Sequence, residues 1–103
     1  MILTTTNSIE HHKVADYLGI VTGVSIKSRE LVKAGFTVKY DNYSQAMEKA
    51  IDELKETAFQ ELRKNAKALG ANAVIGIQID FESVGGTGMF FGVSVSGTAV
   101  KVA

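Results

Sequence analysis

Two groups of side chains in this sequence have the chemistry to bind a metal ion or to move a proton. The first holds the only two histidines, His11 and His12, with Asp16 four residues after His12. On a helix, His12 and Asp16 would be neighbours, and imidazole with carboxylate suits a divalent transition-metal ion. Adjacent residues point in different directions, so the two histidines do not readily hold one ion. The segment predicts either a metal site of His11, His12 and Asp16, strengthened if subunits pool their ligands, or a pair of exposed loop histidines.

The second group is a pair of carboxylates in a segment with the alternation of a strand. Asp80 and Glu82 would share one strand face, about 6.6 Å apart along it. Such pairs serve as general acid and base or hold a cation. Alternation alone explains them as the solvent side of an amphipathic strand, and no nucleophile or orienting partner accompanies them. We therefore expect no enzyme, rank a hydrolase at Asp80 and Glu82 last, and keep the pair as alternative metal ligands pooled from several subunits.

The segment 85–88 (GGTG) has the glycine content of a phosphate-binding loop, but it joins two predicted strands. A phosphate loop gains its strength from the N-terminus of a following helix, and a P-loop also carries a lysine. This segment has neither, so it predicts a hairpin turn. The chain has no cysteine. That excludes disulfides, zinc ribbons, iron–sulfur clusters and a thiol nucleophile.

Length and charge bound the class of protein. The 103 residues are enough for one domain, 1–103, with a modest core. The 11 acidic and 11 basic residues cancel, so we expect neither a nucleic-acid-binding surface nor a polybasic membrane anchor. No apolar run approaches the roughly 20 residues that span a bilayer, and the first residues lack the pattern of a signal peptide. We expect a cytoplasmic protein.

The predicted architecture centres on a helix over 43–69 and the strand that follows it. Apolar residues recur in the helix at steps of three and four, which places them on one face. Gly70 is the expected left-handed stop. Alternation over 75–82 then predicts a strand whose apolar face packs on the helix. The apolar helix positions are Met47, Ala50, Ile51, Leu54, Ala58, Leu62, Ala66 and Leu69, and the apolar strand positions are Ile75, Ile77, Ile79 and Phe81.

Other segments supply the rest of a sheet. Residues 1–6 read as a short strand that pairs within the subunit or with a neighbour. In 17–27 one face carries small residues, which predicts close packing against it. In 89–102 the alternation changes phase near Gly97, which predicts a bulge there. Two weaker patterns suggest helical turns over 28–34 and a strand over 36–40. The order strand, long helix, strand, strand predicts a two-layer α+β fold, with the helix on an antiparallel sheet.

Two features of this architecture bear on assembly. A helix over 43–69 would be roughly 40 Å long, whereas a compact domain of this size is roughly 33 Å across. A long sheet or a neighbouring subunit must therefore cover it. One sheet face would lack a helix, and its mixed composition is typical of a subunit interface, with Phe90 as a candidate anchor. We assign to that face Val21, Gly23, Gln78, Asp80, Phe90, Ser94 and Ser96.

Three stretches together resemble the YbjQ-like family. They are 17–23 (YLGIVTG), 68–76 (ALGANAVIG) and 93–100 (VSVSGTAV). They stand in the family's order with the long helix between them and cover nearly the whole chain. One departure is that many members carry a longer connection with a Gly-Gly-Arg-like turn, where this chain has 36–40 (FTVKY).

The resemblance implies a dodecin-like β-α-β-β subunit and a ring-shaped homo-oligomer, a pentamer, in which extra short strands join neighbours. The family is generally described as uncharacterised, is often labelled heavy-metal-binding, and supplies no catalytic residue. Soft heavy metals prefer thiolates, which this chain lacks, so its residues add little to that label. We expect a non-enzymatic, ring-forming protein that binds a small ligand at subunit interfaces. The alternative is a metal-binding protein whose cofactor is a divalent ion.

Overall fold

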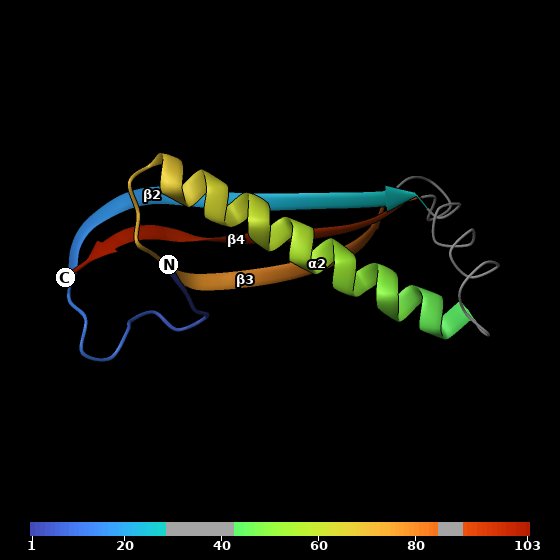
Figure 1. The fold of residues 1–103 in the computed structure, drawn as a ribbon, viewed down its shortest axis with the longest axis horizontal. Helices are drawn as coiled ribbons and strands as arrows, with labels where there is room; N and C mark the ends of the chain where they lie inside the picture. The colour runs from blue at the N-terminus through green and yellow to red at the C-terminus, as the bar shows by residue number, and fades with distance from the viewer. Residues whose placement is uncertain (29–42, 85–89) are drawn as a thin grey trace.

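A computed structural model describes residues 1–28, 43–84 and 90–103. The elements in chain order are β1 (Ile2–Leu3), β2 (Val14–Ser28), α2 (Tyr43–Ala68), β3 (Ala73–Val84) and β4 (Phe90–Val102). The strands form one sheet in the order β1-β3-β4-β2, and α2 crosses one face of it obliquely (Figure 1). The predicted α+β fold and β-α-β-β order are confirmed. The segments 29–42 and 85–89 lie outside the described residues. Three predictions therefore fall wholly or mostly outside them: the helical turns over 28–34, the strand over 36–40 and the hairpin turn over 85–88.

The sheet is mixed rather than purely antiparallel. β4 is antiparallel to both β2 and β3, whereas β1 is parallel to β3. Backbone hydrogen bonds of Thr4 and Thr6 to β3 extend the β1 pairing by a few residues. The N-terminal strand therefore pairs within its own subunit, which was one of the two alternatives.

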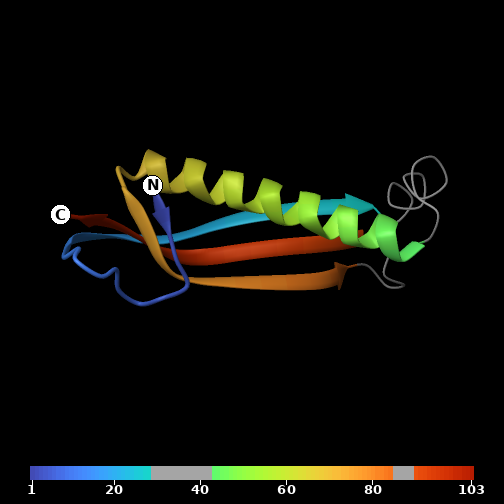
Figure 2. The ribbon, with the colours of Figure 1, turned by 60° about the horizontal axis from the view of Figure 1, so that its bottom comes forward.

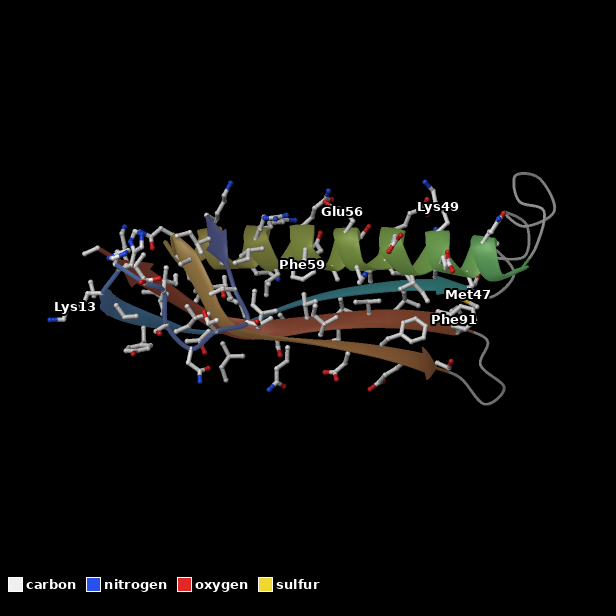
Figure 3. The ribbon with its side chains drawn as sticks, turned by 90° about the horizontal axis from the view of Figure 1, so that it is seen from below. Lys13, Met47, Lys49, Glu56, Phe59 and Phe91 are labelled. Carbon is white, nitrogen blue, oxygen red and sulfur yellow. The ribbon has the colours of Figure 1, made fainter. Side chains whose placement is uncertain are left out.

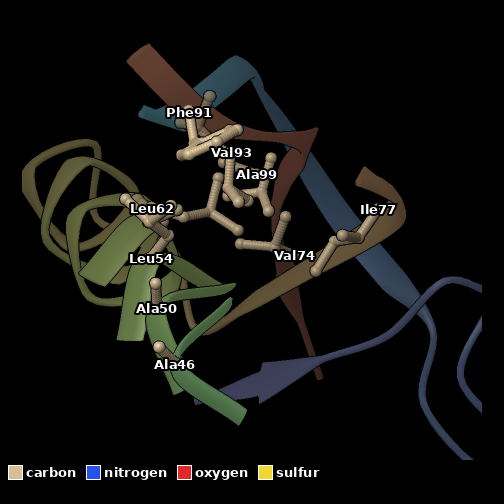
Figure 4. Close-up of a cluster of buried hydrophobic side chains, with 13 residues drawn as sticks. Ala46, Ala50, Leu54, Leu62, Val74, Ile77, Phe91, Val93 and Ala99 are labelled. Carbon is tan, nitrogen blue, oxygen red and sulfur yellow. The ribbon is translucent and has the colours of Figure 1, made fainter. Parts of the chain in front are cut away.

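The face of α2 that contacts the sheet is built on a repeat of four residues. Every fourth residue from Ala46 to Ala66 is buried, and the series consists of four alanines and two leucines (Figure 4). Met47 and Phe59 pack at its margin, whereas Glu56 and Lys49 point away from the sheet (Figure 3). The predicted stripe is thus largely confirmed. The buried positions are Ala46, Ala50, Leu54, Ala58, Leu62 and Ala66; Leu69, which was expected among them, is 46% exposed.

The helix ends as predicted at Gly70, whose φ of 83° is left-handed. Its N–H donates to the Lys67 carbonyl at 2.9 Å, and the Ala71 N–H donates to the Ala66 carbonyl at 3.1 Å. This pair of bonds satisfies carbonyls that would otherwise be unpaired at the helix end. The chain therefore turns directly from α2 into β3.

Close packing on the small face of β2 is also confirmed, and the element that packs there is α2. Gly23 is buried under the helix. A Cβ at this position would collide with the Ala58 carbonyl oxygen and would lie 2.7 Å from the Leu62 nitrogen. Both are backbone atoms, so the helix could move away only as a whole. Glycine at position 23 sets how near α2 lies to the sheet.

The faces of β2 are the reverse of what we assigned. Val21 and Gly23 were placed on the face without a helix, but both are buried against α2. Ile20 is instead 81% exposed on the opposite face, which we call the outer face. The pairing of β2 with β4 is regular from Gly19 to Ser28, so the alternation itself is real, and only its assignment to the two faces of the sheet was wrong.

The bulge predicted in the last strand at Gly97 is wrong, because the extra residue lies on β3, opposite Gly97. The register slips between Ile75 and Gln78, and Gly76 has a φ of 62°, so two β3 residues stand opposite one on β4. Figure 2 shows β3 curving in its first part. Ile75 consequently packs on the outer face with Val100, whereas Ile77 joins the core under α2. Alternation in β4 continues without a break.

The sheet is long enough to account for the length of α2. The molecule measures 50 × 26 × 20 Å, and its radius of gyration is 16.3 Å, compared with about 13 Å for a compact domain of 100 residues. The helix is thus covered along its length by strands of its own chain. Of the two alternatives for its length, the long sheet is the one the structure supports, so helix length does not by itself require a neighbouring subunit.

Asn72 ties the turn after α2 to the end of β4. Its side-chain amide donates to the Val102 carbonyl at 2.9 Å, and its side-chain oxygen accepts from the Val102 N–H at 2.8 Å. We predict that Asn72→Ala lowers the free energy of unfolding by about 1–2 kcal/mol, since two hydrogen bonds at an exposed site are lost. Chemical denaturation measures this. The exposed Gln60→Ala should stay within about 0.5 kcal/mol of wild type, and an equal loss in both variants would contradict the role of Asn72.

Candidate functional site

The two histidines lie in a tight turn before β2 and not on a helix. The His12 N–H donates to the Ile9 carbonyl at 3.1 Å, and His11 has a left-handed φ of 67°. Both side chains are exposed, and the Glu10 carboxylate lies 3.7 Å from His11 Nε2. Asp16 follows on β2. The segment is therefore not helical, so His12 and Asp16 are not neighbours on a helix face. The histidines are exposed residues of a loop, which was the alternative.

Within one chain, the described residues place no three histidine, aspartate or glutamate side chains close enough together to hold a metal ion. His11, His12 and Asp16 belong to the loop and strand start at one end of the molecule, where Lys13 also lies (Figure 3). Asp80 and Glu82 belong to β3 on the outer face of the sheet. A site with three protein ligands from these residues is therefore not present within the described part of one chain.

The two carboxylates do share a face, as predicted, and the sheet gives them specific neighbours. Asp80 stands opposite Ser94 of β4, and Ser94 stands opposite Val24 of β2. Two residues further along the strands, Glu82 of β3 stands opposite Gly92 of β4, and Gly92 stands opposite Ile26 of β2. Each row thus runs from a carboxylate, over a small residue on the central strand, to a branched apolar side chain.

These rows form a groove of about 190 Å³ on the outer face. β3 supplies an acidic wall, β2 an apolar wall, and β4 a floor that is low because glycine and serine occupy it. The strand spacing of about 4.8 Å places the two walls roughly 10 Å apart. The groove could not be found from the sequence, because the register of β2 against β4 decides which residues face each other. The lining residues that the argument uses are Val24, Ile26, Asp80, Glu82, Gly92 and Ser94.

The sheet also exposes large apolar side chains at each of its two long edges. The outer-face patch follows β2 and includes Ile20, Val24 and Ile26, with Phe90 nearby on β4. The helix-side patch lies on β3 and consists of Ile79 and Phe81, which are 46% and 47% exposed. Phe90 points away from the core, as predicted. The exposure of Ile79 and Phe81 was not predicted, because the sequence analysis expected both side chains to pack under the helix.

The position of α2 explains why the helix-side patch is exposed. The helix makes most of its contacts with β2 and β4 and few with β3. It is tied to β2 by Asn65, whose amide donates to the Thr22 carbonyl at 2.8 Å, and by the Lys27–Glu53 ion pair at 2.6 Å. Phe81 can still stack on Phe91, with ring centroids 6.2 Å apart.

Comparison with known proteins identifies the family. The family model described as "Putative heavy-metal-binding" matches residues 1–103, and the chain belongs to this YbjQ family. A UPF0145 protein from Clostridium kluyveri is 47% identical over 105 residues, which cover 99% of each chain. A crystal structure of a protein of unknown function from Pediococcus pentosaceus, assigned to the DUF74 family, matches with a TM-score of 0.70. At 21% identity, over 100% of this chain and 98% of that one, it shows a shared fold.

The family description names heavy-metal binding and no enzymatic activity. The match over residues 1–103 confirms the resemblance that the three sequence stretches indicated. No helix in the described part of the chain is long and apolar enough to cross a membrane.

Proposed function

We propose that this protein is a non-enzymatic, self-assembling subunit that closes into a ring by joining the two different edges of its sheet. The observation that carries the proposal is the helix-side patch, Ile79 and Phe81, which α2 of the same subunit leaves exposed at the β3 edge of the sheet. An interface between two different surfaces of identical subunits is head-to-tail, and such contacts close into rings when the rotation permits. The ring then presents repeated surface grooves to a small ligand.

Both edges have backbone available for pairing. Within 1–28, 43–84 and 90–103, β1 covers β3 only near its start, and no strand pairs with the outer edge of β2. A long unpaired edge is a template for pairing with another chain. Because β2 and β3 are each antiparallel to β4, they run in the same direction. A head-to-tail joint between β3 of one copy and β2 of the next would therefore be parallel.

The same joint would bury the helix-side patch. In each copy, α2 lies over β2 and is fixed to that strand through Asn65 and Lys27. A β3 strand added beside that edge would bring its Ile79 and Phe81 next to the neighbour's helix. The apolar side chains that α2 leaves exposed in one subunit would thus be covered by α2 of the next. Zero net charge keeps long-range repulsion between the copies low.

Native mass spectrometry of the untagged protein tests this assembly. We expect a single closed oligomer, with five copies on the family analogy. Larger oligomers should be absent, because a closed ring leaves no sheet edge unpaired to add another copy. An open series of sizes would mean that the contact does not close. A monomer at micromolar concentration would reject the proposal.

Metal binding is the second candidate, favoured by the family description and by the exposure of both histidines at one end of the molecule. In a ring, His11, His12 and Asp16 of adjacent subunits would supply the ligands that one chain does not bring together. Nitrogen and carboxylate ligands suit zinc, nickel or copper. The carboxylates Asp80 and Glu82, repeated around the ring, are the other ligand set.

We predict that a His11→Ala/His12→Ala variant loses divalent metal that the wild-type ring binds, because each imidazole supplies a nitrogen ligand. Metal content after loading with zinc and desalting measures the stoichiometry. An Asp80→Asn/Glu82→Gln variant should keep its metal. The reverse pattern would move the site to the carboxylates, and no bound metal in the wild type would end this candidate.

A further inference from the structure

A cleft of about 300 Å³ lies between α2 and β2. Its lining includes Ser25 and Lys27 from β2 and Leu54 and Thr57 from α2. Leu54 is only 2% exposed, whereas Thr57 is exposed, so the cleft leads from the core to a polar rim. Lys27 and Glu53, which also line the cleft, form the ion pair that joins the two elements. An apolar side chain could therefore enter the cleft while the charged groups stay at its rim.

The uncovered stretch of β3 stands in the same rows of the sheet as the part of β2 that lines the cleft. Within the described residues, backbone bonds from the N-terminal segment to β3 reach no further than Ile77. The stretch left for a neighbouring copy is therefore 78–84. Through their shared partners on β4, these seven residues stand in the rows of 22–28 on β2.

An in-register joint between copies would bring Phe81 to the cleft. Phe81 and Ser25 both stand opposite Val93, so they share one row and point to the helix side of the sheet. Strands that pair in one sheet also share its pleat, so the helix side continues from one copy into the next. If β3 of one copy pairs in register with β2 of the next, Phe81 lies beside the neighbour's Ser25.

The side chain of Phe81 is already held in place for such a contact. It is 47% exposed, and its aromatic ring stacks on that of Phe91 with an angle of 14° between the planes. Because Phe91 supports it, Phe81 should lose little conformational freedom when a second surface covers it. Aromatic side chains that fill a pocket on the partner commonly carry much of the energy of an interface.

From this juxtaposition we infer that Phe81 anchors the contact between copies by inserting into the cleft between α2 and β2 of the next copy. The aromatic side chain packs against Leu54 and Thr57 there. The site is incomplete within one chain, because one copy supplies the cleft and the next supplies its occupant. This inference rests on the proposed ring and adds to it the register of the joint and the residue that fixes it.

Moving the aromatic side chain from one partner to the other tests the inference. Phe81→Ala should weaken subunit association at least about thirtyfold, the effect of losing a central anchor. Thr57→Phe should weaken it similarly, because the new side chain fills the cleft that Phe81 needs. The double variant Thr57→Phe/Phe81→Ala should return to within about tenfold of wild type, because one aromatic side chain again occupies the cleft. Sedimentation velocity over a concentration series measures all three.

The matched control is Glu56→Phe, which adds the same side chain one residue earlier in α2. Glu56 points away from the sheet (Figure 3), so this variant should associate like the wild type. The inference is overturned if Phe81→Ala associates normally, or if Glu56→Phe is as disruptive as Thr57→Phe. It is also overturned if the double variant shows the two single losses combined.

A disulfide tests the register without removing Phe81. Ser83 and Lys27 both stand opposite Phe91, so within one chain they are two strands apart, roughly 10 Å, which is too far for a disulfide. Across the in-register joint they become neighbours, about 4.8 Å apart. The chain has no cysteine. Oxidised Lys27→Cys/Ser83→Cys should therefore give covalent oligomers on a non-reducing gel.

Lys27→Cys/Glu82→Cys is the control for this disulfide, because Glu82 is on the opposite face of β3. It should stay a single chain on the gel. Equal cross-linking in both variants, or no cross-link in Lys27→Cys/Ser83→Cys, would overturn the inferred register.

The ring and the anchor give different results when they fail. A monomeric wild type would reject the proposed ring and this inference with it. A closed wild-type ring that is indifferent to Phe81→Ala would reject the inference alone and leave the ring standing.

Discussion

Replacing Ile79 by aspartate is expected to convert the assembled protein into monomers. Ile79 is 46% exposed on the helix-side patch, so the fold of one subunit should tolerate a polar side chain there at a cost of about 1 kcal/mol or less. In the ring, the carboxylate would be buried against the neighbour's α2, where an unpaired charge costs several kcal/mol. We expect subunit affinity to fall at least about a hundredfold, at about 1.4 kcal/mol per factor of ten. Sedimentation velocity measures it.

Leu69→Asp is the matched control. Leu69 is as exposed as Ile79, but it follows the last residue of α2 and belongs to no strand. This variant should stay assembled. If both variants dissociate, general loss of surface hydrophobicity would explain the effect. If Ile79→Asp remains a full ring, β3 does not form the contact that we propose.

Replacing Gly23 by alanine should be the most destabilising single-methyl change in the described core. The added Cβ would collide with the Ala58 carbonyl and crowd the Leu62 nitrogen. Overpacking of this kind costs typically 1–3 kcal/mol and occasionally more, and backbone atoms cannot rotate away. We expect a loss of about 3 kcal/mol, which corresponds to a fall in melting temperature of more than roughly 10 °C for a chain of this size.

Gly70→Ala distinguishes collision from backbone strain. No atom lies within 4 Å of a Cβ at position 70, but its φ of 83° disfavours a side chain, so the expected loss is about 1 kcal/mol. Adding Ala58→Gly should not rescue Gly23→Ala, because the colliding atom belongs to the main chain. Wild-type stability in Gly23→Ala would mean that α2 does not approach β2 as closely as described.

The fold was predictable because its strongest signals are local. The three-four repeat of α2 and the left-handed position at Gly70 depend only on neighbouring residues. The small face of β2 also carried correct information, since Gly23 does mark a close approach. Its orientation was nevertheless assigned the wrong way, because the larger apolar residues such as Ile20 were assumed to face the core.

The functional surfaces were less predictable because bulges control them. Each bulge exchanges the two faces of a strand, and a slip of one residue reverses every later side chain. The bulge at Gly76 places Ile75 and Ile77 on opposite faces, although sequence alternation treats them alike. The pairing of Asp80 with Ser94 and Val24 likewise depends on register between distant strands, which a single sequence does not specify.

Head-to-tail joining is tested most directly by mixing two variants that are each broken at a different edge. Ile79→Asp blocks the β3 edge, and Val24→Asp blocks the β2 edge, yet together they retain one intact β2 edge and one intact β3 edge. We predict that each variant alone is a monomer and that an equimolar mixture gives a heterodimer in native mass spectrometry, with no larger species. Homodimers of Ile79→Asp, or a mixture that stays monomeric, would contradict the account.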